Sequence, residues 1–224
     1  MDHDTTRDPR ILLARRACGL LERTSKQKAG VAAALSRDRI AGLISRCESA
    51  VMTLMYMYQP PDLLAASQPV AEIAAAGDAL VQAYAPLLNW TEDGSPVRAN
   101  LRWCLRILGG LGARFTNSGA NLASGIDLVV VEVQNLAVQG TFRVTRVGDG
   151  TAAYTVVTNL AGVATRHRLA AAFLPPREVG GVVSEAMFLG DRDRLEAVGT
   201  LLDSDREDVK EAVAILYEEV GQPR

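Results

Sequence analysis

The chain has 224 residues, of which 48% are hydrophobic and 22% are charged. This composition excludes an intrinsically disordered chain, which would have fewer apolar residues and a larger net charge. The net charge of −2 argues against a general binder of polyanions. No apolar run reaches the length of a membrane span, so we expect no membrane partner.

The cysteines and the N-terminus indicate the compartment. Cys18, Cys47 and Cys104 are odd in number, widely spaced and embedded in helix-like apolar patterns. They are typical of reduced packing residues and not of a disulfide framework or a zinc site. Residues 1–10 are polar and lack the apolar core of a signal peptide. We therefore expect a cytoplasmic protein.

The first half of the sequence has the apolar period of helices. Asp8-Pro9 is a helix-start signal, because aspartate caps the first turn and proline fits the first helical position. Further helices are predicted over residues 36–58, from residue 69 to 87 and from 97 toward 115, separated by the two prolines 60–61 and a turn at 91–96. Their apolar stripes could bind a partner helix, a lipid or a hydrophobic ligand. They are more typical of the mutual core of a helical bundle, which we predict over residues 1–120.

The period changes near residue 126. Residues 116–124 are small and polar, which indicates a linker. Five short β-type segments follow, at 127–134, 141–147, 154–158, 168–174 and 182–189. Residues 148–150 (Gly-Asp-Gly) suit a tight hairpin that needs positive φ values. Five short strands in about 65 residues favour a small closed barrel. This pattern alone does not distinguish the oligonucleotide/oligosaccharide-binding (OB) barrel from other small barrels.

The residues of the last segment carry a resemblance. After Gly181 the chain reads Val-Val-Ser-Glu-Ala-Met up to Met187, and Leu174-Pro-Pro precedes it. This resembles the Ser-Glu-x-Met ending of the tRNA-binding OB family, which is attached to methionyl-tRNA synthetase and to the β-chain of bacterial phenylalanyl-tRNA synthetase, and also occurs as stand-alone dimers. Residues 142–148 and 154–159 resemble the second and third strands of that family. The resemblance covers roughly 65 residues.

With the helical pattern of the first half and of the tail, the resemblance predicts an α+β fold: an N-terminal helical bundle, a five-stranded OB-type β-barrel over 125–190 and a C-terminal helical tail over 191–224. It also implies a nucleic-acid-binding face, because OB barrels bind irregular nucleic acid on strands two and three and the flanking loops. On this basis the arginines would contact phosphate, Ser184 would offer its hydroxyl, and Met187 would either stack on a base or fill the barrel. The candidate nucleic-acid-binding residues are Arg143, Asn159, Arg166, Arg168, Ser184 and Met187.

The tail has its own signals. Residues 191–224 carry ten Asp/Glu against five Lys/Arg, so nucleic acid should avoid them. Residues 204–207 (Ser-Asp-Arg-Glu) fit a capping box that opens a helix with Val209, Val213 and Leu216 on one stripe. We expect this helix to pack on the bundle or on a second subunit.

The functional expectation is therefore a non-enzymatic RNA-binding protein. It would bind tRNA or another structured RNA through the barrel and form a homodimer, as stand-alone relatives do. The alternative is an assembly module whose barrel has lost RNA binding and contacts protein, including an aminoacyl-tRNA synthetase. The lysine-free, charge-neutral barrel supports this alternative. No catalytic, metal-binding or cofactor motif is recognised in the sequence.

Overall fold

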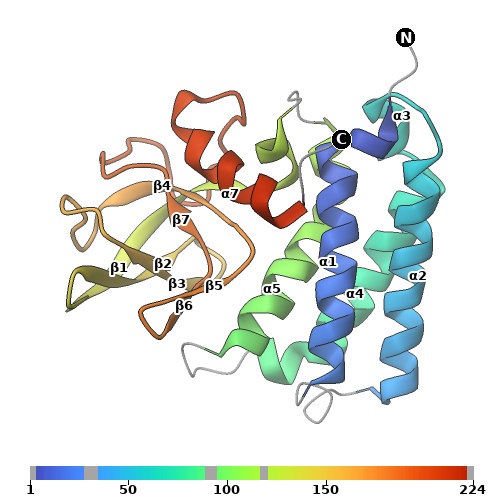
Figure 1. Cartoon of the computed structure of the whole chain (residues 1–224), viewed down its shortest axis with the longest axis horizontal. Coiled ribbons are helices and arrows are strands. Elements are labelled where there is room, and N and C mark those ends of the chain that lie inside the picture. The colour runs from blue at the N-terminus through green and yellow to red at the C-terminus, as the bar shows by residue number, and fades with distance from the viewer. Residues whose placement is uncertain (1–3, 28–34, 89–94, 117–120, 221–224) are drawn as a thin grey trace.

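The structure is a computed structural model of the whole chain, and it describes residues 4–27, 35–88, 95–116 and 121–220. Figure 1 shows a helical bundle on one side, a curled β-sheet on the other, and the C-terminal helix α7 above the place where they meet. The helices of the first half are α1 (Pro9–Lys26), α2 (Arg37–Met55), α3 (Pro61–Ala65), α4 (Gln68–Leu88), α5 (Pro96–Gly109) and α6 (Leu111–Thr116). The expected helical bundle is thus confirmed.

Local capping explains where helix α1 begins. The carboxylate of Asp8 accepts a hydrogen bond of 2.9 Å from the backbone N–H of Arg10, and Pro9 occupies the first helical position. Both features were predicted from the sequence. Short-range signals fix this helix start, because the cap and the proline act within one turn.

Three sequence-based boundaries in this half are wrong. Helix α2 ends at Met55 and not at residue 58, and Pro61 opens the additional short helix α3. The helix expected from residue 97 toward 115 is divided into α5 and α6 after Gly109. The turn expected at 91–96 lies mostly outside the described residues.

The apolar stripes of the helices pack against one another. The largest fully buried side chains include Leu13 on α1, Leu54 on α2, Leu80 on α4 and Leu101 on α5. The three cysteines belong to the same core and are free thiols. Burial raises the pKa of Cys18 to about 12 and that of Cys47 to about 11, so both stay protonated and unreactive near neutral pH. The predicted packing role of the cysteines is confirmed.

The expected polar linker is wrong where the structure describes it. Residues Leu122–Gly125 form the 3₁₀ turn η3, and all four are buried. The Asn121 side chain caps this turn by accepting a 2.8 Å hydrogen bond from Ala123 N–H. At Gly125 a Cβ atom would lie 3.0 Å from the Pro9 carbonyl oxygen, so a glycine lets η3 press directly on α1. The segment therefore belongs to the core of the bundle.

The sheet contains five antiparallel strands in the order β3-β2-β1-β4-β7. The strands are β1 (Leu128–Gln139), β2 (Phe142–Gly148), β3 (Ala153–Thr158), β4 (Arg168–Ala172), β5 (Arg177–Val179), β6 (Val182–Ser184) and β7 (Met187–Phe188). Strands β5 and β6 form a separate two-stranded sheet. The first predicted strand therefore runs five residues further than expected, and the predicted fifth strand is divided into β6 and β7.

Glycines set the turns between these strands. Gly140 has a φ of +61° and directly follows β1, as the first central residue of a type II′ turn requires. Gly180 and Gly181 have φ values of +59° and +83°, which suits a type I′ turn between β5 and β6. In the predicted Gly-Asp-Gly hairpin only Gly150 has a positive φ, while Asp149 accepts hydrogen bonds from Thr151 and Ala152 within the turn.

The C-terminal helix closes one side of the molecule. The 3₁₀ turn η4 (Glu207–Val209) leads into α7 (Lys210–Val220), and the buried Ala212 and Leu216 join the bundle core. Packing on the bundle was one of the two expected positions. The expected capping box is wrong: Arg206 precedes η4, and the buried Ser204 hydroxyl has no hydrogen-bond partner among the residues that the structure describes. Among the described residues, no helix is long and apolar enough to cross a membrane.

Candidate functional site

A cluster of charged side chains lies where α5 meets the sheet. Arg102 and Arg106 are four residues apart and so project from the same face of α5. Arg106 donates to the carboxylates of Asp127, at 2.6 Å, and Asp149, at 3.0 Å. Its third nitrogen donates to the Tyr154 hydroxyl at 3.0 Å. One guanidinium thereby joins the helical half to the residue before β1, to the β2–β3 turn and to β3.

Arg102 makes a second connection between the same elements. It forms an ion pair of 3.2 Å with Glu185 and donates to the carbonyl of Ala153 at 2.9 Å. Its guanidinium carbon lies 4.1 Å from the centroid of the Tyr154 ring, within range of a cation–π interaction.

Arg114 of α6 completes the cluster. Its side chain is 4% exposed and donates to Asp127 at 2.6 Å and to the Ile107 carbonyl at 2.7 Å. Each arginine is thus matched by carboxylates within the same cluster. We call these six residues the junction cluster: Arg102, Arg106, Arg114, Asp127, Asp149 and Glu185.

The protonation of the junction cluster follows from its contacts. Burial alone would raise the pKa of Asp149. Hydrogen bonds from Thr151, Ala152 and Arg106 outweigh this effect and lower that pKa to about 2. Burial raises the pKa of Tyr154, so the hydroxyl stays neutral and donates to Asp149 at 3.1 Å. Near neutral pH the Asp149 carboxylate is therefore ionised beside the Arg106 guanidinium.

A cavity of about 490 Å³ opens beside the junction cluster. Its walls combine apolar residues of α4 and α5 with the aromatic rings of Trp103, Tyr154 and Phe173. The Trp103 indole N–H donates to the Phe173 carbonyl at 3.2 Å, which fixes one wall. Its charged lining residues are Arg102, Arg106 and Glu185, which are paired within the cluster.

The Ser184-Glu185 dipeptide closes the barrel. The backbone N–H of Glu185 donates to the Thr155 carbonyl at 2.8 Å. In return, Thr155 N–H donates to the Glu185 carboxylate at 3.0 Å, and Val157 N–H donates to the Ser184 hydroxyl at 3.0 Å. Side-chain oxygens thus replace strand carbonyls along the edge of β3, which satisfies an edge that would otherwise be open.

This arrangement corrects the expectation for Ser184. The residue is 9% exposed, and its hydroxyl also donates to the Ala186 carbonyl at 2.9 Å. The hydroxyl was expected to lie on an exposed binding face, whereas the structure uses it both as donor and as acceptor inside the sheet. Ser184 is therefore a barrel-closing residue.

Three predicted site residues come together around a second cavity. Asn159, Ser184 and Met187 line a hollow of about 420 Å³ between the barrel and α7. Asp208 and Glu211 of the acidic tail also line it, together with Arg177, which pairs with Glu218. Two carboxylates against one arginine disfavour a phosphate group there. Met187 is half-buried and packs against the bundle core, which fits the packing role considered for it.

The three predicted arginines lie elsewhere. Arg143 sits near the tip of the β1–β2 hairpin, opposite Val138. Arg166, with a φ of +69°, donates its backbone N–H to the Val133 carbonyl at 2.7 Å. Arg168 opens β4, and its side chain is exposed, as is that of Arg166. These arginines do not line the cavity that holds Asn159 and Met187.

Sequence reasoning missed the junction cluster. A signal was present, because Arg102 and Arg106 are spaced by one helical turn directly beside the apolar stripe of α5. Their carboxylate partners lie far away along the chain, so the sequence pattern gives no indication of which carboxylates they meet. Within the described residues, no group of three or more His, Cys, Asp or Glu could hold a metal ion.

Fold and site together define a two-part α+β protein in which a helical domain is fixed to a curled β-sheet by the junction cluster. Residues 1–116 match the model of the family described as the alpha helical domain, and this chain belongs to that family. A comparison with curated proteins finds no match.

Proposed function

We propose that this protein is a non-enzymatic assembly protein whose barrel contacts protein and not RNA. The observation that carries the proposal is the position of the predicted RNA-binding residues. The Ser184 hydroxyl closes the barrel, and Arg143, Arg166 and Arg168 lie away from the cavity that Asn159 and Met187 share.

The charge distribution supports the same proposal. Residues 125–190 contain five Lys/Arg and five Asp/Glu. Helix α7, which belongs to the acidic segment 191–224, lies against one side of the barrel. RNA binding depends on a positive surface that neutralises phosphates. A neutral barrel under an acidic helix is better suited to a protein partner. An aminoacyl-tRNA synthetase is one candidate, suggested by the resemblance of residues 142–187 to the tRNA-binding OB family. The three buried, free cysteines favour a cytoplasmic location for this assembly.

A second candidate function is binding of tRNA or another structured RNA by the OB-type barrel. One observation favours it: Asn159 and Met187 line a shared cavity with Phe142 at the end of β2 and β3. This is the part of an OB barrel that commonly binds nucleic acid.

Fluorescence anisotropy with labelled bulk tRNA at roughly 50 and 200 mM salt separates the two functions. If the assembly proposal is correct, the protein does not bind tRNA at either salt concentration. RNA binding would instead appear as an affinity that falls steeply with salt. In that case Arg166→Ala combined with Arg168→Ala should reduce the slope by about 0.7 to 0.9 log units for each phosphate that the protein no longer neutralises. The matched control is Arg37→Ala with Arg39→Ala, which removes two exposed arginines from α2.

A further inference from the structure

The outer half of β1 is paired on one side only. Strand β4 pairs with residues 128–132 of β1, whereas β2 pairs with residues 132–139. Within the described part of the chain, no strand pairs with the other side of residues 134–139. The β1–β2 hairpin therefore extends beyond the barrel with an open edge.

The register defines which groups face outward. Gln139 and Phe142 flank the two-residue turn, so they exchange both of their backbone hydrogen bonds. Because bonded and non-bonded pairs alternate in an antiparallel ladder, Ala137 also points its N–H and C=O toward β2. The N–H and C=O groups of Leu136 and Val138 then point away from β2. The Asn135 side chain accepts from Leu136 N–H at 2.7 Å, which fits this outward direction.

This edge lacks the usual protection of an exposed strand. Natural edges are blunted by lysine, proline, inward-pointing charges or β-bulges. Residues 133–142 contain no charge and no proline, and the bulge of this strand lies at its inner end, between Val133 and Asn135. Val138 is 69% exposed. Leu136 lies on the same face two residues away and packs partly against the barrel core. A short apolar row thus continues from the core to the open edge.

We propose that this edge pairs with the same edge of a second copy of the chain, in antiparallel orientation about a two-fold axis. The inference rests on the proposed assembly function and names its partner. The Val138 N–H and C=O, together with those of Leu136, would form the new ladder. The Asn135 side chain would give up the Leu136 N–H to the partner strand.

Self-complementarity argues for a second copy over an unlike peptide. An antiparallel pair of identical edges satisfies the same donors and acceptors on both sides, as an isologous two-fold interface requires. The uncharged edge brings no like charges together near the axis, and the net charge of −2 gives little overall repulsion. Leu136 and Val138 would then meet their counterparts and extend the apolar row.

The test is the molar mass of the intact chain by sedimentation equilibrium over about 5 to 200 μM, because a homodimer depends on concentration. Wild type is expected to approach twice 24.0 kDa. Val138→Pro removes the outward N–H but no bond of the β1–β2 ladder, and edge strands tolerate proline at such positions. Val138→Lys places like charges beside the axis. Both variants are expected to weaken dimerisation by at least about tenfold, while Asn135→Ala strengthens it by freeing a donor.

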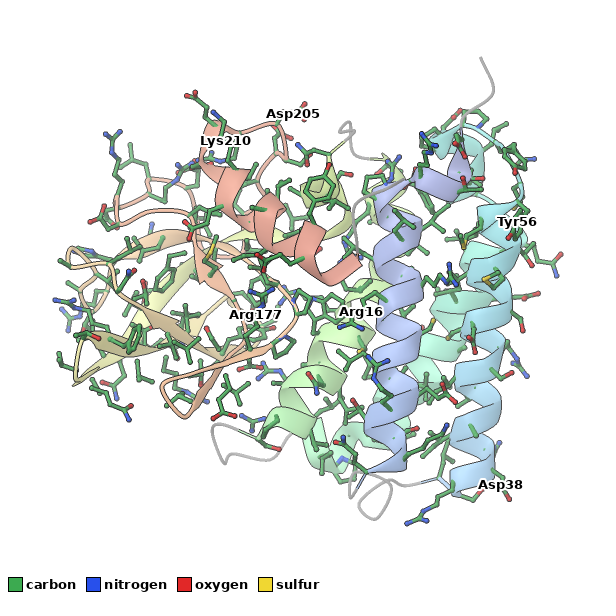
Figure 2. All side chains as sticks on the ribbon, in the orientation of Figure 1. Arg16, Asp38, Tyr56, Arg177, Asp205 and Lys210 are labelled. Carbon is green, nitrogen blue, oxygen red and sulfur yellow. The ribbon has the colours of Figure 1, made fainter. Side chains whose placement is uncertain are left out.

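Two control variants keep the result interpretable. Leu195→Lys introduces the same charge at a side chain that is 97% exposed outside the hairpin, and it should leave the dimer unchanged. Tyr56 is 61% exposed on the outer side of the bundle (Figure 2). A dimer lost in Tyr56→Asp but retained in both Val138 variants would overturn the edge assignment.

A monomeric wild type at every concentration would also overturn this inference. That outcome would leave the assembly proposal intact, because the proposal depends on the separate anisotropy measurement with tRNA.

Discussion

The two ends of the barrel treat their polar groups in opposite ways. At the end that meets α5, six charged side chains from both halves of the molecule are buried or half-buried and paired with one another. At the hairpin end, residues 133–142 carry no charge, and the backbone of Leu136 and Val138 faces solvent. Charged side chains therefore connect the helical bundle to the sheet, whereas the edge of the β1–β2 hairpin presents backbone hydrogen-bonding groups and apolar side chains.

The contrast between the two ends of the barrel is tested most directly at Asp127, whose carboxylate accepts hydrogen bonds from both Arg106 and Arg114. Asp127→Ala would leave two largely buried guanidinium groups without this carboxylate. We expect a loss of about 3 kcal/mol in the free energy of unfolding, measured by urea denaturation followed by circular dichroism. Asp205→Ala removes an exposed carboxylate and should change stability by less than about 0.5 kcal/mol. Equal effects of the two variants would contradict an attachment role for the junction cluster.

The pH dependence of stability should report Asp149. Its folded-state pKa of about 2 lies below the usual value of 3.8, so the stabilisation is complete above pH 4 and is lost as the pH falls toward 2. The contribution amounts to about 2 kcal/mol. Asp149→Asn should be less stable at neutral pH and show a flatter acid limb. The check is a series of urea denaturations from pH 6 to pH 2, and an acid limb as steep as wild type would rule Asp149 out as its cause.

Ser184→Ala tests how much the side-chain closure of the β3 edge contributes to stability. The substitution leaves the partly buried Val157 N–H without its acceptor, which should cost about 1 kcal/mol in unfolding free energy. Ser184→Thr retains the hydroxyl and serves as the conservative comparison. If Ser184→Ala unfolds at the wild-type urea concentration, side-chain closure of the β3 edge contributes nothing.

The smallest effect is expected at an exposed ion pair of the bundle. Lys26 donates to Glu22 at 2.7 Å, but both side chains are more than half exposed. Solvent screens such pairs, so Lys26→Ala should leave the midpoint of urea unfolding within experimental error. A shift comparable to that of Asp127→Ala would mean that burial is not what distinguishes the junction cluster.

The sequence predicted the element types well because they depend on local period. The helical start at Asp8, the bundle core and the change to strands near residue 126 all follow from spacing and capping. The single fifth strand was wrong because Ser184 and Glu185 interrupt it to place side-chain oxygens along β3. Sequence spacing does not encode this replacement, because it depends on where another strand lies.

The site was predictable to a smaller extent. Asn159, Ser184 and Met187 do gather, since the motif brings neighbouring strand ends together. The arginines do not, because their positions depend on barrel curvature and on the loops that enter β4. The assignment of 1–120, 125–190 and 191–224 as separate domains stays a prediction. Side chains such as Leu128 and Leu174 share the apolar core of the helices.

The cysteines give this architecture an internal reporter. All three thiols lie in α1, α2 and α5 and are at most 2% exposed, so an alkylating reagent reaches them only when the bundle opens. Their rate of modification therefore measures how fast the bundle opens, whereas circular dichroism measures the unfolding of both the bundle and the sheet. If the junction cluster makes the two halves open together, the rate of thiol modification equals the unfolding rate from circular dichroism in the wild type. In Asp127→Ala the two rates should differ.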